Sequence, residues 1–463
     1  RGLGDVYKRQ VLEGLRALAE MIRDTSDCAI GYEAARSVLE GLDTFADEYA
    51  SHLRDRSCQE GVGQTVPCET LCPAHVDVPA YIALTAAGDY AGAVNMVRKD
   101  NPFPTACAFV CEHPCETRCR RTLIDAPINI RGIKKFAVDQ MPADQVAPPP
   151  RSVDTARTVA VIGGGPSGLT CAYFLALMGH RVTVFEERAQ LGGMLRYGIP
   201  EFRLPKTVLD DFEYRHLRLK GIKVRPNTDV GKALKIEDLF RDGYKAIFIG
   251  TGVWRPNTLH IKGESLGNVH YAINYLQNPD VYHLGSRVIV IGAGNAAMDV
   301  ARTAIRHGTR HLECFSLSKT ISASEYEASY AKLEGVGFRF CKAPVEIREN
   351  GLICRDTVKG EDGKFTQVEG SETLYPHTGV IVSVSQGSES NLVKTTTGIE
   401  TNQKGLLSVS EDGRTTREGV FAGGDAVMGA RTVVEAVAVA KKVAVAMDLS
   451  LIHISEPTRL ALI

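Results

Sequence analysis

Six cysteines stand four residues apart in two groups near the start of the chain. Thiols spaced in this way could form disulfides, bind a metal, or be inert core residues. Disulfides are rare in reducing cytosol, and zinc sites usually use cysteine pairs with two residues between them. Soft thiolates on short helical turns can converge on one iron–sulfur cubane, so an iron–sulfur site, a zinc site and inert thiols all stay open on the spacing alone. The six residues are Cys68, Cys72, Cys107, Cys111, Cys115 and Cys119.

The composition is that of an ordinary globular protein, with 463 residues of which 44% are hydrophobic and 24% are charged. The formal net charge of -1 gives no basic field for nucleic acid or for an anionic membrane. No apolar run is long enough to span a bilayer, and no signal peptide is recognisable. We therefore expect a cytoplasmic protein with no membrane insertion and no nucleic-acid partner.

A glycine motif follows the apolar run TVAVI and precedes a helical pattern. Gly163 can make the tight turn, Gly165 lets the backbone approach a pyrophosphate, and Gly168 lets the helix pack on the strand. The phosphates then sit at the positive end of the helix. Glu186 ends the next apolar run, RVTVFE, where a carboxylate can accept hydrogen bonds from ribose hydroxyls. The combination predicts a dinucleotide site, and the alternative is a plain packing turn.

A second copy of this strand–turn–helix pattern occurs in RVIVIGAGNAAMDVARTAIR, with Gly292, Gly294 and Ala297 at the three motif positions. Two nucleotide folds in one chain suggest a flavin and a nicotinamide that meet face to face, with the chemistry carried by the flavin. The stretch GVFAGGDAVMGARTVVEA adds Asp425 for the ribityl chain or pyrophosphate and a helix start near Thr432 for the flavin's pyrimidine edge. The alternative for Asp425 is a turn residue that caps a helix. Hydride transfer to a flavin needs no catalytic acid or base, and we predict none.

The domain organisation follows from changes in pattern along the chain. We expect an α/β protein with two Rossmann-type domains. A family resemblance, whose motifs follow, implies that the nicotinamide domain is inserted in the FAD domain and that an α-helical iron–sulfur domain precedes both. Both chain ends lack helical or strand periodicity, so we interpret them as non-native extensions of a piece of a longer protein. The expected segments are an extension (1–10), a helical remnant of a cluster domain (11–57), the [4Fe–4S] domain (58–140), a linker (141–155), the first segment of the FAD-binding domain (156–265), the NAD(P)-binding domain (266–384), the second segment of the FAD-binding domain (385–449) and an extension (450–463).

These motifs resemble those of the small (beta) subunit family of glutamate synthase over residues 58 to 449. The likeness rests on GGGPSGL, GGMLRYGIPEFRLPK, GAGNAAMDVARTA, KLEGV, GVFAGGD and the cysteine stretch NPFPTACAFVCEHPCETRCRR. It implies that FAD oxidises NAD(P)H and exchanges electrons with a partner through one or two [4Fe–4S] clusters. The cofactor-binding residues that the motifs and the resemblance imply are Gly163, Gly165, Pro166, Ser167, Gly168, Glu186, Gly193, Tyr197, Gly198, Thr251, Gly252, Gly292, Gly294, Asn295, Ala297, Gly424, Asp425, Thr432 and Val433.

The cysteine set departs from the family pattern. Relatives usually carry two further cysteines before Cys68, at positions held here by Glu60 and Gly63, and Cys58 is out of register. The resemblance implies two clusters. The candidate ligands of the second are Cys68, Cys119 and Cys58, and this cluster needs a further non-cysteine or irregular ligand. The ligands expected for the first cluster are Cys72, Cys107, Cys111 and Cys115.

The nicotinamide site also departs from the family. Many NADPH-using relatives have arginines after this strand to grip the 2′-phosphate, where this chain has Phe315, Ser316 and Leu317. Charge-assisted contacts contribute about 1.5–3 kcal/mol each, so we expect NADH to be favoured. Three cations leave NADPH binding open: Arg302, Arg306 and Lys319. The two arginines are more simply solvated helix charges. Ser385 stands where relatives usually have glycine, so its side chain crowds a backbone near the cofactor.

The segment before the cysteine domain contains LAEMIRDTSDCAIG and LDTFADEYASHL. It resembles the C-terminal cluster domain of the NADH-binding flavoprotein subunit of NADH:quinone oxidoreductase. That likeness implies that Cys28 is a cluster ligand whose partners are not in this chain, and the alternative is a buried helix cysteine. The upstream partner would then be a fused NADH dehydrogenase module.

The leading hypothesis is an FAD and iron–sulfur NAD(P)H oxidoreductase that passes electrons to a partner subunit or module. The alternative is a non-catalytic electron-wiring subunit with a degenerate nicotinamide site, which the changes at Ser316, Leu317 and Ser385 keep open. A thioredoxin-reductase-like enzyme is disfavoured, because neither nucleotide domain contains a C-x-x-C pair.

Overall fold

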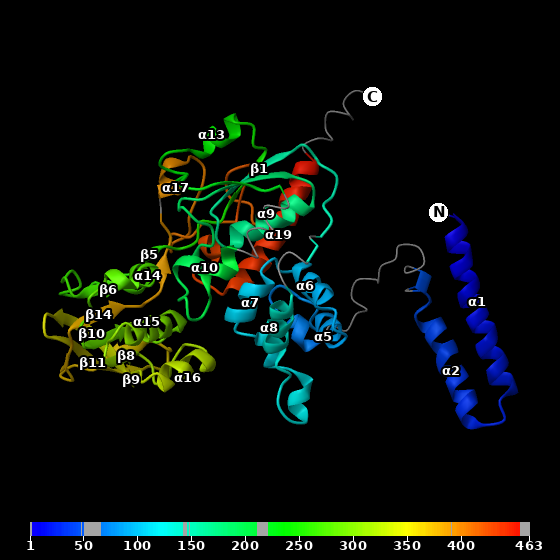
Figure 1. The fold of residues 1–463 in the computed structure, drawn as a ribbon, viewed down its shortest axis with the longest axis horizontal. Helices are drawn as coiled ribbons and strands as arrows, with labels where there is room; N and C mark the ends of the chain where they lie inside the picture. The colour runs from blue at the N-terminus through cyan, green and yellow to red at the C-terminus, as the bar shows by residue number, and fades with distance from the viewer. Residues whose placement is uncertain are drawn as a thin grey trace. The chain divides into compact units, whose positions relative to one another are not determined.

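The computed structural model comprises two compact units, Arg1–Val66 and Pro67–Ile463. In Figure 1 the first unit contains the blue helices, and the second carries the strands. The residues that the structure describes are 2–47, 49–50, 66–141, 146–147, 149–210, 221–389 and 391–453. Among these residues, no helix is long and apolar enough to cross a membrane.

The first unit is a helical hairpin formed by α1 (Gly2–Thr25) and α2 (Ala29–Thr44). Ala19, Ala35 and Leu39 are buried where the two helices meet. Helix α1 begins at Gly2 and so includes most of the segment 1–10, which has no helical periodicity in its sequence. A helix continues through a segment without an apolar stripe, since its backbone hydrogen bonds do not depend on one.

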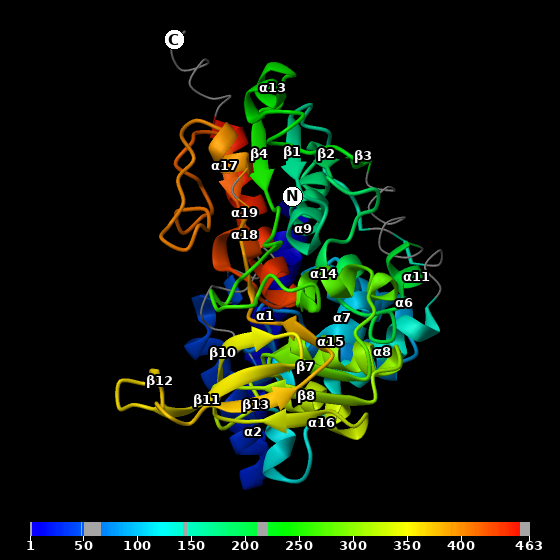
Figure 2. The same ribbon diagram turned by 90° about the vertical axis from the view of Figure 1, so that its left-hand side faces the viewer.

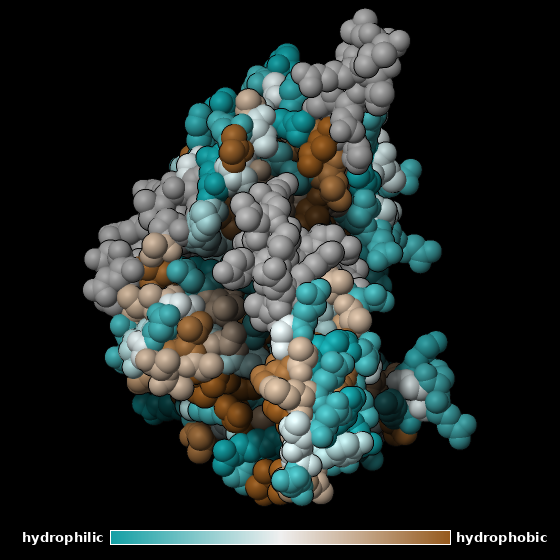
Figure 3. Space-filling view, turned by 90° about the vertical axis from the view of Figure 1, so that its right-hand side faces the viewer, coloured by the Kyte–Doolittle hydropathy of each residue, from teal (hydrophilic) through white to brown (hydrophobic). Residues whose placement is uncertain are grey.

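Large apolar side chains remain exposed on this hairpin. They are Leu15, Leu18, Met21, Ile22, Ile30, Tyr32, Val38 and Phe45. The molecular face drawn in Figure 3 likewise carries brown, apolar residues between teal, polar ones. The apolar surface of the two helices is therefore wider than the stripe that they bury against each other.

The cysteine domain at the start of the second unit is built from short helices. Its elements are α4 (Pro67–Thr70), α5 (Val78–Ala86), α6 (Tyr90–Arg98), α7 (Pro104–Val110), η1 (Pro114–Glu116), η2 (Arg120–Leu123) and α8 (Ile130–Gln140). Side-chain caps begin three of them: Asp77 accepts from the Ala80 amide, Asp89 from Gly92 and Asn129 from Gly132. The cysteines lie within these short helices or in the turns that join them.

A parallel sheet in the order β16-β4-β1-β2-β3 forms the first Rossmann domain. Its strands are β1 (Thr158–Ile162), β2 (Arg181–Phe185), β3 (Lys223–Arg225), β4 (Ala246–Ile249) and β16 (Val420–Ala422). β1 is almost wholly apolar because helices cover the sheet, including α9 (Pro166–Leu177) and α19 (Val433–His453), which pack on each other. β16 joins β4 although about 170 residues separate them, so the first domain is made of two chain segments.

A second parallel sheet, in the order β6-β14-β7-β8-β9, forms the second Rossmann domain. Its strands are β6 (Val269–Tyr271), β7 (Arg287–Ile291), β8 (His311–Phe315), β9 (Gly337–Arg339) and β14 (Gly379–Val382), and its helices are α14 (Ala272–Gln277), α15 (Asn295–Arg306) and α16 (Glu325–Leu333). An antiparallel layer follows, whose strands are β10 (Lys342–Arg348), β11 (Gly351–Lys359), β12 (Phe365–Gln367) and β13 (Thr373–Pro376). Figure 2 shows β12 at the end of a projecting arm. The two nucleotide motifs thus begin helices α9 and α15 of separate sheets.

Two very short strands, β5 (Arg255–Pro256) and β15 (Gln386–Gly387), pair antiparallel where the chain passes between the Rossmann domains. The remaining short helices are α10 (Met194–Tyr197), α11 (Lys206–Val208), α13 (Ile236–Arg241), η5 (Pro279–Val281), α17 (Asn391–Thr395) and α18 (Asp425–Met428). The covalent connection between the two domains is therefore slender.

The C-terminal helix α19 continues past the expected boundary at residue 449 and ends at His453. Leu451 is only 1% exposed and belongs to the core of the first Rossmann domain. The interpretation of residues 450–453 as a structureless extension is therefore wrong, because burial of Leu451 continues the helix. Residues 454–463 lie outside the described residues of the chain.

Candidate functional site: a shared nucleotide cavity beside a cysteine cavity

One large cavity, of about 820 Å³, opens between the two Rossmann domains. Gly163, Gly164 and Gly165 line it from the first domain, and Gly294 and Ala297 line it from the second. Ligand sites in such folds lie at the carboxyl ends of the parallel strands, where both motifs begin. The arrangement brings the two predicted nucleotide sites into one continuous space.

The first glycine motif adopts the geometry that its sequence predicts. Gly163 has φ +100°, and a Cβ there would stand 2.5 Å from the carbonyl oxygen of Gly250. A Cβ on Gly168 would stand 1.9 Å from the Gly163 carbonyl oxygen, so α9 packs directly on the turn. Gly165 is the N-cap of α9 and lines the cavity. Gly163 and Gly168 therefore each have a steric reason to be glycine, and Gly165 brings the start of α9 to the cavity.

The cavity wall contains polar groups that suit the phosphates and ribose of FAD. The Ser167 hydroxyl is buried and has no hydrogen-bond partner among the described residues, although it lines the cavity. Glu186 accepts from the Gly164 amide at 2.6 Å and from the Arg188 amide at 2.9 Å. Burial raises the pKa of the Glu186 carboxyl. The residues present therefore fit the group, with an orphan donor at the helix start and a carboxylate at the end of β2.

The C-terminal segment closes the same cavity. Asp425 lines it and accepts from the Arg431 amide at 3.2 Å. Burial raises the pKa of Asp425 to about 7, so this carboxyl keeps its proton up to near-neutral pH. Thr432 and Val433 line the cavity at the start of α19, with the Thr432 amide and hydroxyl both donating to Glu435. The helix start that was expected to face the flavin is thus part of the cavity wall.

The second motif is built like the first but is connected to the cysteine domain. Gly292 has φ +132°, and a Cβ there would stand 2.2 Å from the Ser383 carbonyl oxygen. Asn295, at the first position of α15, accepts from the Ser324 amide at 2.9 Å through its side-chain oxygen. Its side-chain nitrogen donates to the carboxylate of Glu112, which lies between two of the predicted cluster cysteines. A residue of the cysteine domain therefore contacts the start of the nicotinamide motif.

The loop after β8 presents little positive charge. Phe315 and Ser316 are buried, and the Ser316 hydroxyl is engaged with that of Ser318 at 3.1 Å. Lys319 is exposed. The expectation that Arg302 is a solvated helix charge is wrong, because its side chain is 8% exposed. The helix places it against the carboxylates of Glu327 and Glu334 and the rings of Phe202 and Tyr330.

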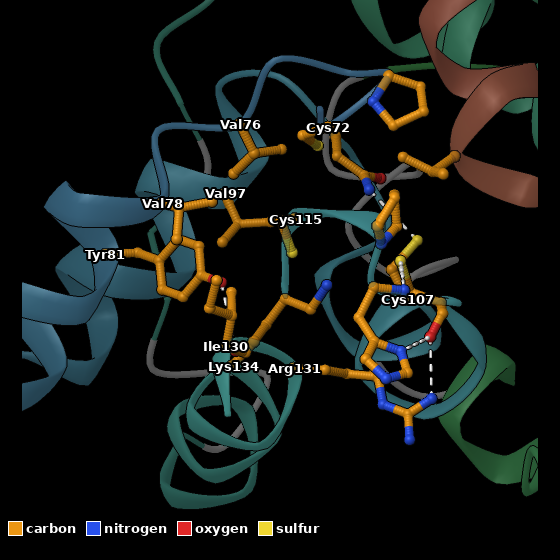
Figure 4. Close-up of a pocket in the computed structure, with 16 residues that line it drawn as sticks. Cys72, Val76, Val78, Tyr81, Val97, Cys107, Cys115, Ile130, Arg131 and Lys134 are labelled. Carbon is orange, nitrogen blue, oxygen red and sulfur yellow. Dashed lines mark hydrogen bonds between the residues drawn. The ribbon is translucent and has the colours of Figure 1, made fainter. Parts of the chain in front are cut away.

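A second, smaller cavity lies in the cysteine domain (Figure 4). Four of the predicted ligands line it: Cys72, Cys107, Cys111 and Cys115. Figure 4 shows Cys115 and Lys134 directed into the same space. N–H groups already donate to sulfur here, from the Asn101 side chain to Cys107 and from the His113 amide to Cys111. Hydrogen bonds of this kind tune iron–sulfur clusters, so the donor set fits a [4Fe–4S] cubane.

No group of His, Cys, Asp or Glu in the described ranges is close enough to hold a single metal ion. This is compatible with a cubane, whose four irons keep the thiolates farther apart than one ion would. Disulfides are not formed either, since all the described cysteines are free. The free thiols around this cavity are therefore compatible with a multi-iron cluster.

The other predicted ligands do not line this cavity. Cys68 and Cys119 are close enough for the charge of Cys119 to help burial raise the pKa of the Cys68 thiol. Cys58 lies outside the described residues. Cys28 is exposed at the N-cap of α2, so the alternative of a buried helix cysteine is wrong. The structure thus separates the six thiols into a set of four and a pair.

Comparison with known proteins identifies the family. Residues 157–442, more than half of the chain, match the family described as Pyridine nucleotide-disulphide oxidoreductase, which also matches at 126–238. The chain belongs to this family. Residues 41–146 match Dihydropyrimidine dehydrogenase domain II, 4Fe-4S cluster, and residues 4–52 match NADH-ubiquinone oxidoreductase-F iron-sulfur binding region.

Curated relatives support the same assignment. NADP(+)-dependent formate dehydrogenase subunit beta of Moorella thermoacetica is 32% identical, over 94% of this chain and 73% of the relative. Glutamate synthase [NADPH] small chain of Halomonas elongata is 32% identical, over 80% of this chain and 84% of the relative. FprA of Mycobacterium tuberculosis in complex with NADPH has a TM-score of 0.56 at 17% identity, over 65% of this chain and 86% of that chain, and shows the fold alone.

This pyridine nucleotide-disulphide oxidoreductase is therefore a flavin- and NAD(P)H-dependent enzyme with [4Fe–4S] domains, and the predicted resemblance to the glutamate synthase small-subunit family is confirmed. The electron-wiring alternative is not favoured. The predicted preference for NADH is not supported by these relatives, since the names of both contain NADP(+) or NADPH. Homologous subunits of larger enzymes are consistent with a partner subunit.

Most predicted binding residues of this oxidoreductase line the shared cavity, but some act behind it. The predicted residues that do not line it are Gly168, Tyr197, Gly292 and Gly424. Gly424 has φ +68° and lies against Ser167, while the Tyr197 ring stacks on the Arg188 guanidinium. The glycines therefore shape the turns, and Tyr197 positions a neighbouring side chain.

Sequence reasoning missed several lining residues. They include Glu112, Arg188, Met194, Arg203, Trp254, Asp299 and Gln386. Arg203 stands inside the motif GIPEFRLPK, whose resemblance to the family motif does not single out this side chain. An arginine between two large apolar residues, Phe202 and Leu204, was the available signal, because charges are rarely buried without a partner.

Proposed function

We propose that this chain oxidises NADH through FAD and passes the electrons to a [4Fe–4S] cluster held by Cys72, Cys107, Cys111 and Cys115, and from there to a partner subunit. When bound, the flavin accepts a hydride, which is two electrons with one proton, and releases electrons one at a time. The protein's own residues bind and orient the two nucleotides. Gly165 and Ser167 line the cavity where they would hold one pyrophosphate, and Gly294 lines it where it would hold the other.

The observation that carries this proposal is the wall shared by the two cavities. Cys111 lines the cysteine cavity, and the next residue, Glu112, lines the nucleotide cavity. On α19, Val434 lines the cysteine cavity and its neighbour Val433 lines the nucleotide cavity. A single layer of residues thus separates the flavin and cluster sites.

The preference for NADH rests on the loop after β8. Ser316 and Leu317 bring no charge to the end of this strand. Arg302 and Arg306 are already paired with carboxylates of their own domain. A 2′-phosphate would therefore find Lys319 as its cation on this loop. The NADP(+) and NADPH in the relatives' names argue for the opposite preference, so the question needs a direct test.

The test is anaerobic reduction of the flavin- and cluster-loaded protein with NADH and NADPH, added separately, while flavin absorbance and the cluster's EPR signal are recorded. We expect fast bleaching by NADH, followed by a reduced-cluster signal. If neither nucleotide bleaches bound flavin, the proposed activity is wrong, and an electron-wiring role replaces it. Faster bleaching by NADPH refutes the preference and leaves the activity intact.

Two variants test the loop itself. The double substitution Ser316→Arg and Leu317→Arg should raise the bleaching rate with low NADPH at least tenfold, because each charge-assisted contact contributes about 1.5–3 kcal/mol. The rate with NADH should change less than twofold. Lys319→Ala is the matched control. It should weaken NADPH binding only if this lysine already pairs with the 2′-phosphate.

A further inference from the structure

Phe202 and Arg203 form an interdomain hook, in which two neighbouring residues of the first Rossmann domain contact the second. Arg203 Nη1 donates to both carboxylate oxygens of Asp299, each at 2.7 Å, and Nη2 lies 2.7 Å from Glu327 Oε1. Asp299 is on α15 and Glu327 is on α16. One guanidinium from the first domain therefore joins two helices of the second.

The contact is buried and its charges are matched. The side chains of Arg203, Asp299 and Glu327 are 13%, 7% and 5% exposed. Arg302 lies 3.3 Å from the other oxygen of Glu327 and pairs with Glu334 at 2.9 Å. Burial raises the pKa of Asp299 to about 6 even though Arg203 opposes the shift. Loss of Arg203 would leave a buried carboxylate without its main partner.

The ring of Phe202 adds an apolar half to the hook. The guanidinium groups of Arg302 and Arg306 lie 4.7 Å and 4.2 Å from its centroid. Both arginines belong to α15, so Phe202 and Arg203 engage the same helix side by side. The hook therefore restricts rotation of α15 as well as its separation from the first domain.

The covalent link between the domains does little to set their orientation. It runs through β5 and β15, which share only two residue pairs. Ser385, directly before β15, has φ +71°, a conformation that non-glycine residues rarely adopt. A further contact between the two Rossmann domains joins Arg188 to Gln277 at 3.1 Å, and Glu112 of the cysteine domain contacts Asn295 of the second. Among these, the hook is the one with paired, buried charges.

The hook also lies in the right place to act on the reaction. Arg203 and Asp299 line the same cavity as Gly165 and Gly294, the phosphate-binding turns of the two motifs. We propose that Arg203 is a positioning residue that holds the second Rossmann domain in the orientation in which its nicotinamide ring faces the flavin. This inference rests on the proposed function. It requires that domain orientation, rather than nucleotide affinity, depend on the hook.

The experiment compares four variants of the flavin- and cluster-loaded full chain: Arg203→Gln, Arg203→Lys, Asp299→Asn and, as a matched control, Arg417→Ala. Arg417 pairs with Glu237 at 2.5 Å within the first domain and does not line the cavity. Hydrogen exchange of the protein without NADH or NADPH reports on the interface between the two Rossmann domains. Stopped-flow bleaching over a range of NADH concentrations separates the limiting rate from the half-saturating concentration.

We expect Arg203→Gln to lower the limiting bleaching rate at least tenfold, with the half-saturating NADH concentration changed less than threefold. Peptides that cover α15 and α16 should exchange faster, and those that cover β1 and α9 should not. Arg203→Lys should recover part of the rate, because an ammonium keeps the charge but cannot bridge both carboxylates. Arg417→Ala should match the wild type in the bleaching rate and in exchange of α15 and α16.

Equal limiting rates for Arg203→Gln and wild type would overturn the inference, as would a change confined to the half-saturating concentration. If Arg203→Gln does not fold with its flavin, Asp299→Asn decides in the same way, since it removes one charge and keeps the shape. Wild-type protein that is not bleached by either nucleotide contradicts the proposed function instead. In that case the exchange data still decide whether the hook holds the interface.

Discussion

The first glycine motif offers a sharp steric test through Gly168→Ala. The new Cβ would stand 1.9 Å from the Gly163 carbonyl oxygen and 3.2 Å from Val161 Cγ1, whereas real Cβ contacts are not shorter than 3.0 Å. Helix α9 or the turn would therefore have to move by about 1.1 Å. Overpacking of this kind costs about 1–3 kcal/mol, and more when backbone rather than a flexible side chain must yield. We therefore expect Gly168→Ala to lower the free energy of unfolding by about 3 kcal/mol.

The assay is thermal unfolding together with the flavin content of the purified protein. At roughly 2–4 °C per kcal/mol for a domain of this size, Gly168→Ala should melt roughly 6–12 °C lower and retain little FAD. The second motif supplies the control, because Ala297 already holds a buried methyl at the equivalent position. Ala297→Gly should cost only about 1 kcal/mol.

Helix propensity alone gives the opposite sign for Gly168→Ala, since alanine is favoured over glycine by about 1 kcal/mol inside a helix. A variant with unchanged or higher melting temperature and full flavin content would therefore refute the steric reasoning. It would also mean that α9 is farther from the Gly163 turn than the structure places it.

Three further changes test other regions of the structure. Ser385→Gly should stabilise the protein by about 1 kcal/mol, because a left-handed φ of +71° is unfavourable for serine; an equal or lower melting temperature contradicts this. The raised pKa of Asp425, about 7, means that the folded chain holds a proton that the unfolded chain loses above pH 4, so stability falls as pH rises from about 4 to 7. The unfolding free energy lost over this range is at most about 4 kcal/mol. Asp425→Asn should make the melting temperature less dependent on pH over the same range; a variant with the same pH dependence as the wild type contradicts this role of Asp425. Cys115→Ala should abolish the iron content assigned to the first cluster. Cys171 is buried and does not line that cavity, so Cys171→Ala should leave the iron content unchanged. Equal iron content in the two variants contradicts the ligand set.

The glycine turns and the four cavity cysteines could be predicted from sequence because their causes are local. A turn with φ near +100° at Gly163, a missing Cβ at Gly168 and a thiol on each short helical turn are visible within a few residues. Burial of most of a strand is also a local signal, since TVAVI is apolar after its first residue, Thr158. These features determine where each nucleotide motif begins and ends.

The contacts between domains could not be predicted in this way. Arg203 and Asp299 are 96 residues apart, and no pattern links them. Arg302 was expected to be a solvated helix charge. Its partners Phe202 and Glu327 come from other regions of the chain. Similarly, α19 continues to His453 because tertiary burial of Leu451 outweighs a sequence without helical period.

The wall between the two cavities has a consequence for how this protein tolerates motion. Because Cys111 and Glu112 are adjacent in sequence, their Cα atoms are separated by one planar peptide unit, about 3.8 Å long. The separation of the two cavities along this stretch is thus set by covalent bonds, which thermal motion and domain rotation do not stretch. Cys111 and Glu112 therefore keep the walls of the two cavities together along this stretch, whatever the orientation of the second Rossmann domain.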